Sequence, residues 1–394
     1  MDTAAADPHA ALRAIGWPLD ADSAAGEGGP DPRPPQADWA RAWAGLIAAH
    51  PQARPARVSE QHRSGYVVAE GPDGALAAEA MPEWLRRRFP AQQRGGVGDW
   101  VLIEGGDDTA AEGAAARAQI VALLPRHSVI KRAAAGEHYH QQIIAANVDT
   151  VFVVCGLDAD FNPRRIERYL LLVRGGGAEP VVVLTKADKD GSDAGAGLAA
   201  LSDLAAQGFA AVAVNATDAE SVQTLDPWLR PGRTAVLVGS SGAGKSTLTN
   251  TLLGYERMKT GAVRDSDDRG RHTTTHRSLI PLPSGACLID TPGMRELKPT
   301  GEEDLADGGF ADVEALAAAC RFRDCRHARE PGCAVRAAIE RGDLDLRRFA
   351  NYLKLRDEVA GAAATLAVRQ AQKGEARKPA RAQPRRLDET YGED

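Results

Sequence analysis

The stretch Thr234-Ala-Val-Leu-Val-Gly-Ser-Ser-Gly-Ala-Gly-Lys-Ser246 runs from an apolar, strand-like segment into a glycine-rich loop. The loop fits the pattern Gly-x-x-x-x-Gly-Lys-Ser, and the helix-like run Thr247–Leu253 follows it. A strand, a glycine loop and a helix in this order bind phosphate, because the glycines let backbone N–H groups turn inward and the helix amino terminus favours an anion. The stretch therefore predicts an α/β domain that binds a nucleotide.

The residues of this loop have distinct expected roles. Lys245 is expected to reach the β and γ phosphates, and the Ser246 hydroxyl is expected to bind Mg²⁺. The predicted nucleotide contacts here are Gly239, Ser240, Ser241, Gly242, Ala243, Gly244, Lys245, Ser246 and Thr247. The loop alone does not separate GTPases from ATPases or small-molecule kinases.

A motif that can read the nucleobase lies upstream of the loop. It is Thr185-Lys186-Ala187-Asp188, at the end of an apolar run. Asp188 can accept both N–H groups on the Watson–Crick edge of guanine, which adenine does not offer, and Lys186 would lie along the base. The usual first residue is Asn, so Thr185 is expected to remove an amide that ties the base motif to the phosphate loop. Asn215 and Ala216 end the next strand, where the Ala216 N–H is a weaker candidate for contact with the guanine oxygen.

Two later segments are placed to sense the γ phosphate. Asp290-Thr-Pro-Gly293 follows an apolar strand, so Asp290 can hold Mg²⁺ through water and the Gly293 N–H can contact the phosphate. Gly270-Arg-His-Thr-Thr-Thr275 lies between this segment and the phosphate loop. A threonine hydroxyl there can complete the Mg²⁺ shell; Thr274 is the first choice and Thr273 the second.

The residue that orients the attacking water is in question. Many GTPases place Gln after the glycine of the last motif, but this chain has Met294, which cannot do so. His272 is the candidate replacement, because it is close to Thr274 and exchanges a proton near neutral pH. The predicted catalytic residues are thus His272, Lys245 and Thr274, although His272 can also be an ordinary loop histidine.

The order of these motifs is unusual. A common GTPase runs from phosphate loop through the two switch segments to the base motif, whereas here the base motif comes first. Such an order indicates a circularly permuted GTPase domain.

Composition limits the alternatives. The chain has 394 residues, 43% of them hydrophobic and 26% charged, and a net charge of −6. These values give no global electrostatic case for nucleic acid, so RNA binding would depend on local basic patches. Neither a membrane helix nor a signal peptide is evident. We therefore expect a cytoplasmic protein without membrane contact, in which the 5 cysteines are reduced.

Patterning divides the chain into a β-rich part and an α/β part. Short β-like runs separated by glycine turns between Arg57 and Leu124 predict a small β-barrel. From Asp149 on, continuous apolar runs alternate with helical patterns, which predicts a parallel sheet. The expected segments are a flexible extension at 1–53 with a short helix near 38–50, the barrel at 54–127, the GTPase domain at 128–300, a helical metal-binding domain at 301–360 and a flexible tail at 361–394.

The cysteine cluster predicts a metal site. Cys320-x₄-Cys325-x-His327-x₅-Cys333 supplies three thiolates and one imidazole, a tetrahedral ligand set for one Zn²⁺ per chain. The alternative is a set of reduced, metal-free cysteines. Arginines near the cluster, which can meet a phosphate backbone, are Arg321, Arg323, Arg326, Arg329, Arg336, Arg341, Arg347 and Arg348. The barrel segment also contains basic residues that can meet a phosphate backbone, among them Arg57, Arg94, Arg117 and Arg126.

In this order, the base motif, the phosphate loop, Gly270–Thr275, Asp290–Gly293 and the cysteine cluster closely resemble the ribosome small subunit-dependent GTPase A family (RsgA, also called YjeQ). The resemblance runs from about Arg57 to Leu355. It implies an amino-terminal OB-fold, a circularly permuted GTPase and a carboxy-terminal zinc domain.

The resemblance also implies function. Members act late in small ribosomal subunit maturation, and the subunit stimulates their GTP hydrolysis. The expected partners are therefore GTP or GDP with Mg²⁺, the small ribosomal subunit and its rRNA, and the protein is expected to be a monomer. An RNA-binding nucleotide switch with negligible turnover is the alternative, since Met294 is not Gln. A metabolic kinase is disfavoured by Asp188.

Overall fold

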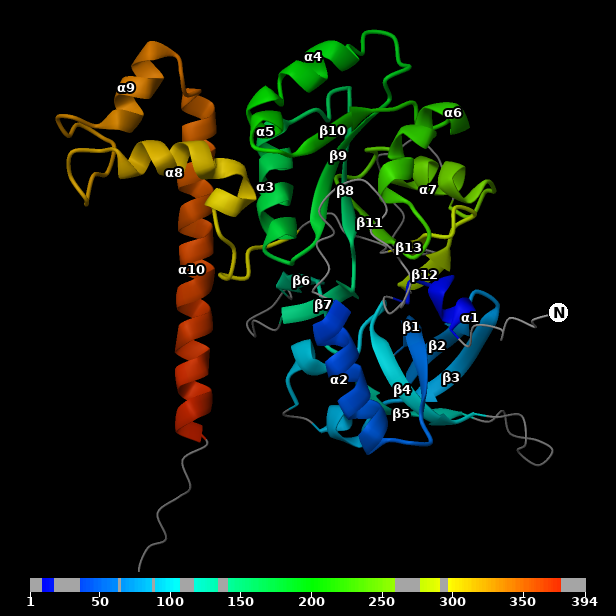
Figure 1. The fold of residues 1–394 in the computed structure, drawn as a ribbon. Coiled ribbons are helices and arrows are strands. Elements are labelled where there is room, and N and C mark those ends of the chain that lie inside the picture. Colours follow the sequence, from blue (N-terminus) through cyan, green and yellow to red (C-terminus); the bar gives the residue numbers. More distant parts are fainter. Residues whose placement is uncertain are drawn as a thin grey trace, which may run out of the picture.

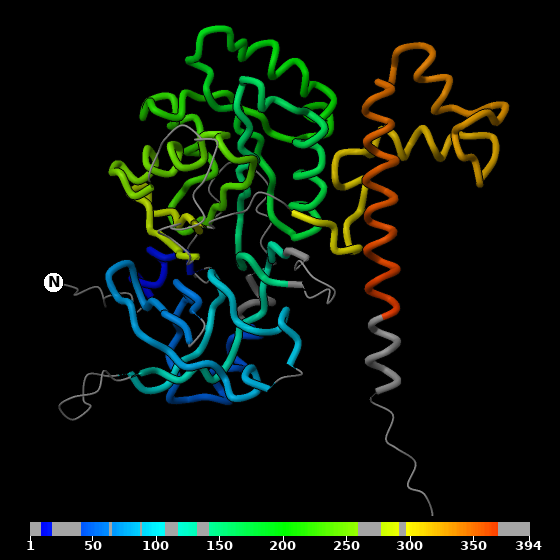
Figure 2. The backbone as a smooth tube through the Cα atoms, turned by 180° about the vertical axis from the view of Figure 1, so that it is seen from behind, coloured from blue at the N-terminus to red at the C-terminus, as the bar shows by residue number. Residues whose placement is uncertain are grey.

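The computed structural model describes residues 9–17, 36–62, 65–86, 89–106, 117–133, 141–258, 277–290 and 297–376. Three parts are visible in Figure 1: a barrel at one end, an α/β sheet domain above it, and a helical lobe at the side. The view from behind in Figure 2 shows the same arrangement, with the last helix running alongside the other two parts.

The amino-terminal barrel has five strands. They are β1 (Arg54–His62), β2 (Gly65–Gly71), β3 (Gly74–Glu79), β4 (Trp100–Gly105) and β5 (Ala118–Leu123). Neighbours pair in the order β1-β2-β3-β5-β4, and β4 returns to pair with β1, which closes the barrel. Alternate residues such as Val58, Val68 and Ile120 fill the interior. The predicted barrel is confirmed.

The second part is the predicted α/β sheet. Its strands are β8 (Thr150–Gly156), β9 (Glu179–Thr185), β10 (Ala210–Ala213), β11 (Thr234–Val238), β12 (Ser278–Pro281) and β13 (Cys287–Asp290). They lie in the order β10-β9-β8-β11-β13-β12, and all their pairings are parallel except the last. The strand before the phosphate loop, β11, therefore lies at the centre of the sheet although β8, β9 and β10 precede it in the chain, which agrees with the permuted order of the motifs.

Helices cover both faces of this sheet, which explains its continuous apolar strands. Val151 and Val153 pack with residues of α3 (Pro163–Arg174), whereas Phe152 and Val154 pack with residues of α7 (Lys245–Leu253). Successive side chains of a strand point to opposite faces, so both sets are buried. Figure 1 shows α3, α4 (Ala194–Ala199) and α5 (Ser202–Ala206) on one face, and α6 (Ala219–Val222) and α7 on the other.

A hairpin and a strand pairing are among the contacts that join the barrel to the sheet domain. A hairpin of β6 (Val129–Ala133) and β7 (Gln141–Ala146) lies between them (Figure 1). In addition, Glu60 of β1 pairs with Ser278 of β12, so the barrel and the α/β strands share one hydrogen-bonded sheet. The sequence patterns did not predict this continuity, because a strand does not reveal its partner.

Part of the amino-terminal extension packs on the barrel. It forms α1 (Ala10–Arg13) and α2 (Gln36–Ala49), the latter close to the predicted helix at 38–50. Trp17 is buried and meets Trp43 and Trp100 edge-on, with ring centroids 4.6 and 4.7 Å apart. The sequence predicts a flexible extension here, but three indole rings that bury one another hold this part of it in place.

The third part is helical. A π-helical turn (Ala306–Phe310) leads to α8 (Ala311–Ala318), α9 (Ala334–Arg341) and the long α10 (Leu346–Ala376). Phe310, Val335 and Leu355 lie in its separate apolar core. Helix α10 continues into the segment 361–394, for which the sequence predicts a flexible tail. Among the helices that the structure describes, none has the length and apolar character needed to cross a membrane.

Candidate functional site

The predicted nucleotide motifs meet at one edge of the α/β sheet. The phosphate loop follows β11, Asp290 ends β13, Thr185 ends β9, and Asn215 comes soon after β10. These strands are parallel, so their carboxyl ends lie at the same edge, where open α/β sheets bind ligands. Pairing across the sheet thus brings together motifs that the permuted order separates along the chain.

The phosphate loop has the glycine-dependent geometry that the sequence predicts. Gly239 has φ +145°, and a Cβ there would lie 2.1 Å from the Val154 carbonyl oxygen, so any larger residue would clash with β8. Gly244 has φ +92° and begins α7. The Lys245 ammonium donates to the carbonyls of Gly239 (2.9 Å) and Ser240, which holds it over the loop.

The base motif is tied to the phosphate loop by a hydroxyl group. Thr185 is buried, and its Oγ1 donates to the Ala243 carbonyl at 2.6 Å. Thr185 lacks the amide of the usual Asn, but its hydroxyl supplies a different tie to the loop. The loop comes close enough for the shorter side chain to reach it, since a Cβ on Gly244 would lie 3.1 Å from the same hydroxyl.

Hydrogen bonds also connect the other segments on the side of the site where the nucleobase would lie. Asp188 is exposed beyond the end of β9, where its carboxylate can meet a ligand. The Ala187 N–H donates to the Val214 carbonyl (3.4 Å), and the Thr251 hydroxyl of α7 donates to the Ala216 carbonyl (2.6 Å). The two base-side loops and the phosphate-loop helix thus support one another.

A loop that sequence reasoning missed lies beside these motifs. Asp158 and Asp160 follow β8, and their carboxylates contact Lys186 and Ser240. Burial opposes ionisation of Asp158, but the Lys186 ammonium outweighs it, so the pKa of Asp158 lies below its usual value. In the sequence, the acidic residues directly after a buried strand were the signal that could have revealed this loop.

The Asp290 carboxylate is suited to bind a cation. Its Oδ2 is buried and has no hydrogen-bond partner among the residues that the structure describes. Burial raises the pKa of this carboxyl, and the nearby Arg257 opposes the rise only in part. A buried carboxylate oxygen with no donor is suited to Mg²⁺ or to its water shell. Other predicted residues of this region, His272, Thr273, Thr274, Gly293 and Met294, lie outside the described residues.

The four predicted ligands of the metal site come together. The ligand atoms of Cys320, Cys325, His327 and Cys333 all lie within 4.8 Å of one another, so the cluster can hold a metal ion. They come from the loop between α8 and α9 and from the residue that caps α9. The Cys333 sulfur accepts the Arg336 N–H at 3.4 Å.

Neighbouring residues hold the ligand loop in shape. The Glu330 carboxylate accepts N–H groups from Arg326, Ala328 and Arg329. Its own backbone N–H, followed by these bonds, lowers the pKa of Glu330. These bonds close a tight turn in which His327 takes φ +58°. The imidazole then lies edge-on to Phe349, with centroids 5.6 Å apart. The ligand loop is therefore shaped by contacts other than those of the ligands themselves.

Three of the arginines that we expected to contact RNA instead use their guanidinium groups for contacts within the protein. Arg57 and Arg348 are each 1% exposed. Arg57 donates to the carbonyls of Ile15, Gly98 and Asn147, and Arg126 binds the buried Asp99 carboxylate at 2.6 Å. For Arg57 and Arg348, the predicted contact with a phosphate backbone is wrong, because an arginine in the interior uses its donors there. The Arg126 side chain is 15% exposed and directs its guanidinium to Asp99.

Comparisons with known proteins agree with this geometry. A family model described as RsgA GTPase matches residues 123–300. "Small ribosomal subunit biogenesis GTPase RsgA" from Xanthomonas campestris pv. campestris (strain B100) is 66% identical over 375 residues, which are 94% of this chain and 95% of that protein. The protein of the same name from Xanthomonas euvesicatoria pv. vesicatoria (strain 85-10) is 65% identical over the same shares.

Two solved structures share the fold. YjeQ from Thermotoga maritima has a TM-score of 0.56 and 24% identity, covering 78% of this chain and 99% of its own. YloQ, titled a circularly permuted GTPase, has a TM-score of 0.54 and 22% identity, covering 79% of this chain and 96% of its own. At these identities the likeness concerns the arrangement of the domains and strands.

Proposed function

Because this chain belongs to the RsgA family of GTPases, we infer that it hydrolyses GTP to GDP and phosphate and acts in the biogenesis of the small ribosomal subunit. One observation carries the nucleotide part of this inference. The Thr185 hydroxyl joins the base motif to the Ala243 carbonyl of the phosphate loop, so the base and phosphate sites form one unit.

Specific residues are proposed for the nucleotide. Asp188 would accept the two N–H groups of guanine, with Lys186 along the base and the Ala216 N–H near the guanine oxygen. Backbone N–H groups of Gly239–Ser246 would surround the phosphates, with Lys245 between the β and γ groups. Ser246, Thr274 and Asp290 would hold Mg²⁺, which neutralises charge on the phosphates when it is bound. The buried Asp290 Oδ2, which has no hydrogen-bond partner within the described ranges, supports this assignment.

We propose that the cysteine cluster binds Zn²⁺. In a tetrahedral zinc site, neighbouring sulfurs lie roughly 3.8 Å apart and a sulfur and a nitrogen roughly 3.5 Å apart, given the usual bond lengths. Here the sulfurs of Cys320 and Cys333 are 3.9 Å apart, and each lies 3.5 Å from Nδ1 of His327. The donor set and its spacing therefore suit Zn²⁺ with no open position.

The partner of the helical lobe is proposed to be rRNA of the small subunit, which the protein would meet as a monomer. Several arginines around the metal site are exposed and can contact a phosphate backbone. They are Arg321, Arg323, Arg326, Arg329, Arg341 and Arg347. Such a local basic surface would act despite the net charge of −6.

The function is tested by turnover with two nucleotides. Phosphate release is measured from GTP and from ATP, each with and without purified small ribosomal subunits. We expect turnover of GTP, stimulated by the subunits, and negligible turnover of ATP, because adenine lacks the paired donors for Asp188. GTP binding without any stimulation would instead favour a nucleotide switch that binds RNA.

His272 is proposed to orient or deprotonate the attacking water. Replacing His272 by Ala should lower subunit-stimulated turnover on the order of 10²-fold, the usual contribution of a positioned acid or base, while GTP affinity stays unchanged. His127→Ala is not a suitable control, because that ring is buried beside Asp149. His62 is a better control, because its half-buried side chain contacts Glu60 on the barrel. Equal turnover of His272→Ala and wild type, with and without subunits, would remove His272 from the mechanism.

A further inference from the structure

The loop Leu157–Phe161 contacts both halves of the nucleotide site. It connects β8 to α3 and belongs to none of the recognised motifs. The Asp158 carboxylate lies 2.5 Å from the Lys186 ammonium of the base motif. The Asp160 carboxylate accepts the Ser240 hydroxyl of the phosphate loop through Oδ2. A single short loop thus holds one residue of each motif.

The same loop is held by the first turn of α3. Asn162 caps this helix by accepting the N–H groups of Arg164 and Arg165. The Arg165 guanidinium contacts Oδ1 of Asp160 at 2.5 Å, on the other side of the carboxylate from Ser240. The Asp160 carboxylate is therefore fixed between the phosphate loop and α3.

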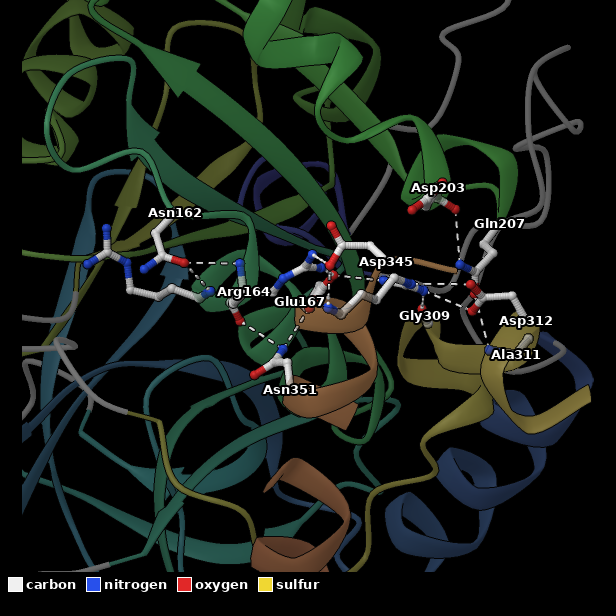
Figure 3. Close-up of polar contacts among 12 residues, drawn as sticks. Asn162, Arg164, Glu167, Asp203, Gln207, Gly309, Ala311, Asp312, Asp345 and Asn351 are labelled. Carbon is white, nitrogen blue, oxygen red and sulfur yellow. Dashed lines mark hydrogen bonds and ion pairs between the residues drawn. The ribbon is translucent and has the colours of Figure 1, made fainter. Parts of the chain in front are cut away.

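One turn further along α3, the helical lobe is attached through a buried carboxylate. Glu167 is 2% exposed and receives three donors. Arg164 comes from α3 itself (2.5 Å), whereas Arg348 (2.7 Å) and Asn351 (2.6 Å) come from α10. Figure 3 shows this cluster, in which Arg164 also reaches Asp345 at 3.0 Å.

Arg348 extends the attachment to the rest of the lobe. Its guanidinium binds the Asp312 carboxylate at 2.8 Å and the Gly309 carbonyl at 2.6 Å. Separating α10 from α3 would break the charge-assisted bond from Arg348 to Glu167 and the bond from Asn351, both of them formed in a buried contact. Helix α3 and the metal-binding lobe are therefore expected to move as one body.

We propose that Asp158 and Asp160 are positioning residues of the nucleotide site, and that α3 couples them to the metal-binding lobe. The proposal rests on the GTPase function above. It adds a path by which a partner bound to the lobe controls the nucleotide site. Asp158 holds Lys186 where the base would lie, and Asp160 holds the phosphate loop through Ser240. A shift of α3, produced when a partner binds the lobe, then changes both contacts together. Coupling of this kind is reciprocal, so bound nucleotide also biases the lobe.

The positioning role is tested by release of a fluorescent GDP analogue from the full-length protein. Asp160→Asn should release it about 10-fold faster, the effect of losing one charge-assisted hydrogen bond, and Asp158→Asn several-fold faster. Asp203→Asn is the matched control, since Asp203 is an exposed carboxylate on α5. The unfolding midpoint of Asp160→Asn should match that of wild type, which separates positioning from damage to the fold.

Ser240→Ala tests whether Asp160 acts through the phosphate loop. In a Ser240→Ala background, Asp160→Asn should have little further effect on GDP release, because the contact it disrupts is already gone. Additive effects of the two changes would contradict this part of the proposal. So would unchanged or slower GDP release from Asp160→Asn alone.

The coupling is tested with Asn351→Ala, a mild change in the lobe that leaves Arg348 with Glu167. Asn351→Ala should change the rate of GDP release about 3-fold in the wild-type background. In the Asp160→Asn background it should leave that rate unchanged. Among the described hydrogen bonds the two residues share no partner, so independent sites would give additive effects and overturn the coupling. If wild-type protein fails to prefer GDP over ADP, the proposed function fails. If wild type prefers GDP and the variants behave like it, only the present inference fails.

Discussion

Replacing Lys245 by Met is expected to lower kcat/KM for GTP by about 10³-fold, the upper range for removing one preorganised charge from a reacting site. The Lys245 ammonium lies over the phosphate loop, held by the Gly239 and Ser240 carbonyls. Phosphoryl transfer depends mainly on positioning and on charge stabilisation, and methionine has similar length but no charge. Phosphate release under single-turnover conditions, with small subunits present, measures the loss.

The control is the same substitution at Lys354, an exposed residue of α10. Lys354→Met should keep the turnover of wild type within about 2-fold, as surface changes usually do. A Lys245→Met protein that keeps more than a tenth of wild-type turnover would show that this loop is not the reacting phosphate site. GDP affinity measured on the same protein separates weak binding from slow chemistry.

Removing a ligand of the metal site should produce the largest effect on structure. Cys325→Ser, or chelation of the wild-type protein, should remove one metal ion per chain and unfold the loop between Cys320 and Cys333. Binding of zinc to such small sites is worth roughly 10–16 kcal/mol, which the local fold cannot replace. Metal content by elemental analysis and local hydrogen exchange measure the two changes.

Loss of the metal should affect stimulation by small subunits more than it affects GDP affinity. Stimulation by small subunits is expected to fall at least 10-fold, whereas GDP affinity should change no more than about 3-fold, since the Glu167 contacts to α10 do not involve the metal ligands. Asp324→Asn, an exposed change within the same loop, is the matched control. Added Zn²⁺ should restore the chelated protein. Full stimulation of Cys325→Ser would contradict the proposed role of the lobe.

Much of the fold was predictable because its signals are local. Continuous apolar runs predicted parallel strands such as β8, β9 and β11, and the glycine loop after β11 predicted the start of α7. The spacing of the four ligands predicted a cluster that the structure brings together. Each of these patterns depends on the backbone geometry of one short segment, so neighbours in sequence are sufficient to reveal it.

Contacts between distant segments were less predictable. The sequence indicated that Thr185 lacks the amide that usually ties the base motif to the phosphate loop, but it did not reveal that the hydroxyl would bind the Ala243 carbonyl instead. Arg348 was grouped with the surface arginines, but it is buried against Glu167, and the 2 residues are 181 positions apart in the chain. Type and spacing of residues do not reveal which charge will be covered by another element.

The chemistry of this protein can be read from its residues alone: a permuted set of GTPase motifs, a closed metal-ligand set and three kinds of domain. How these parts are connected depends on the folded arrangement of distant segments. That arrangement placed Asp158 and Asp160 on Lys186 and Ser240, and it buried Glu167 between α3 and α10. The physical reason is that motif chemistry follows from residues a few positions apart. The partner of a buried charge depends on how whole elements pack.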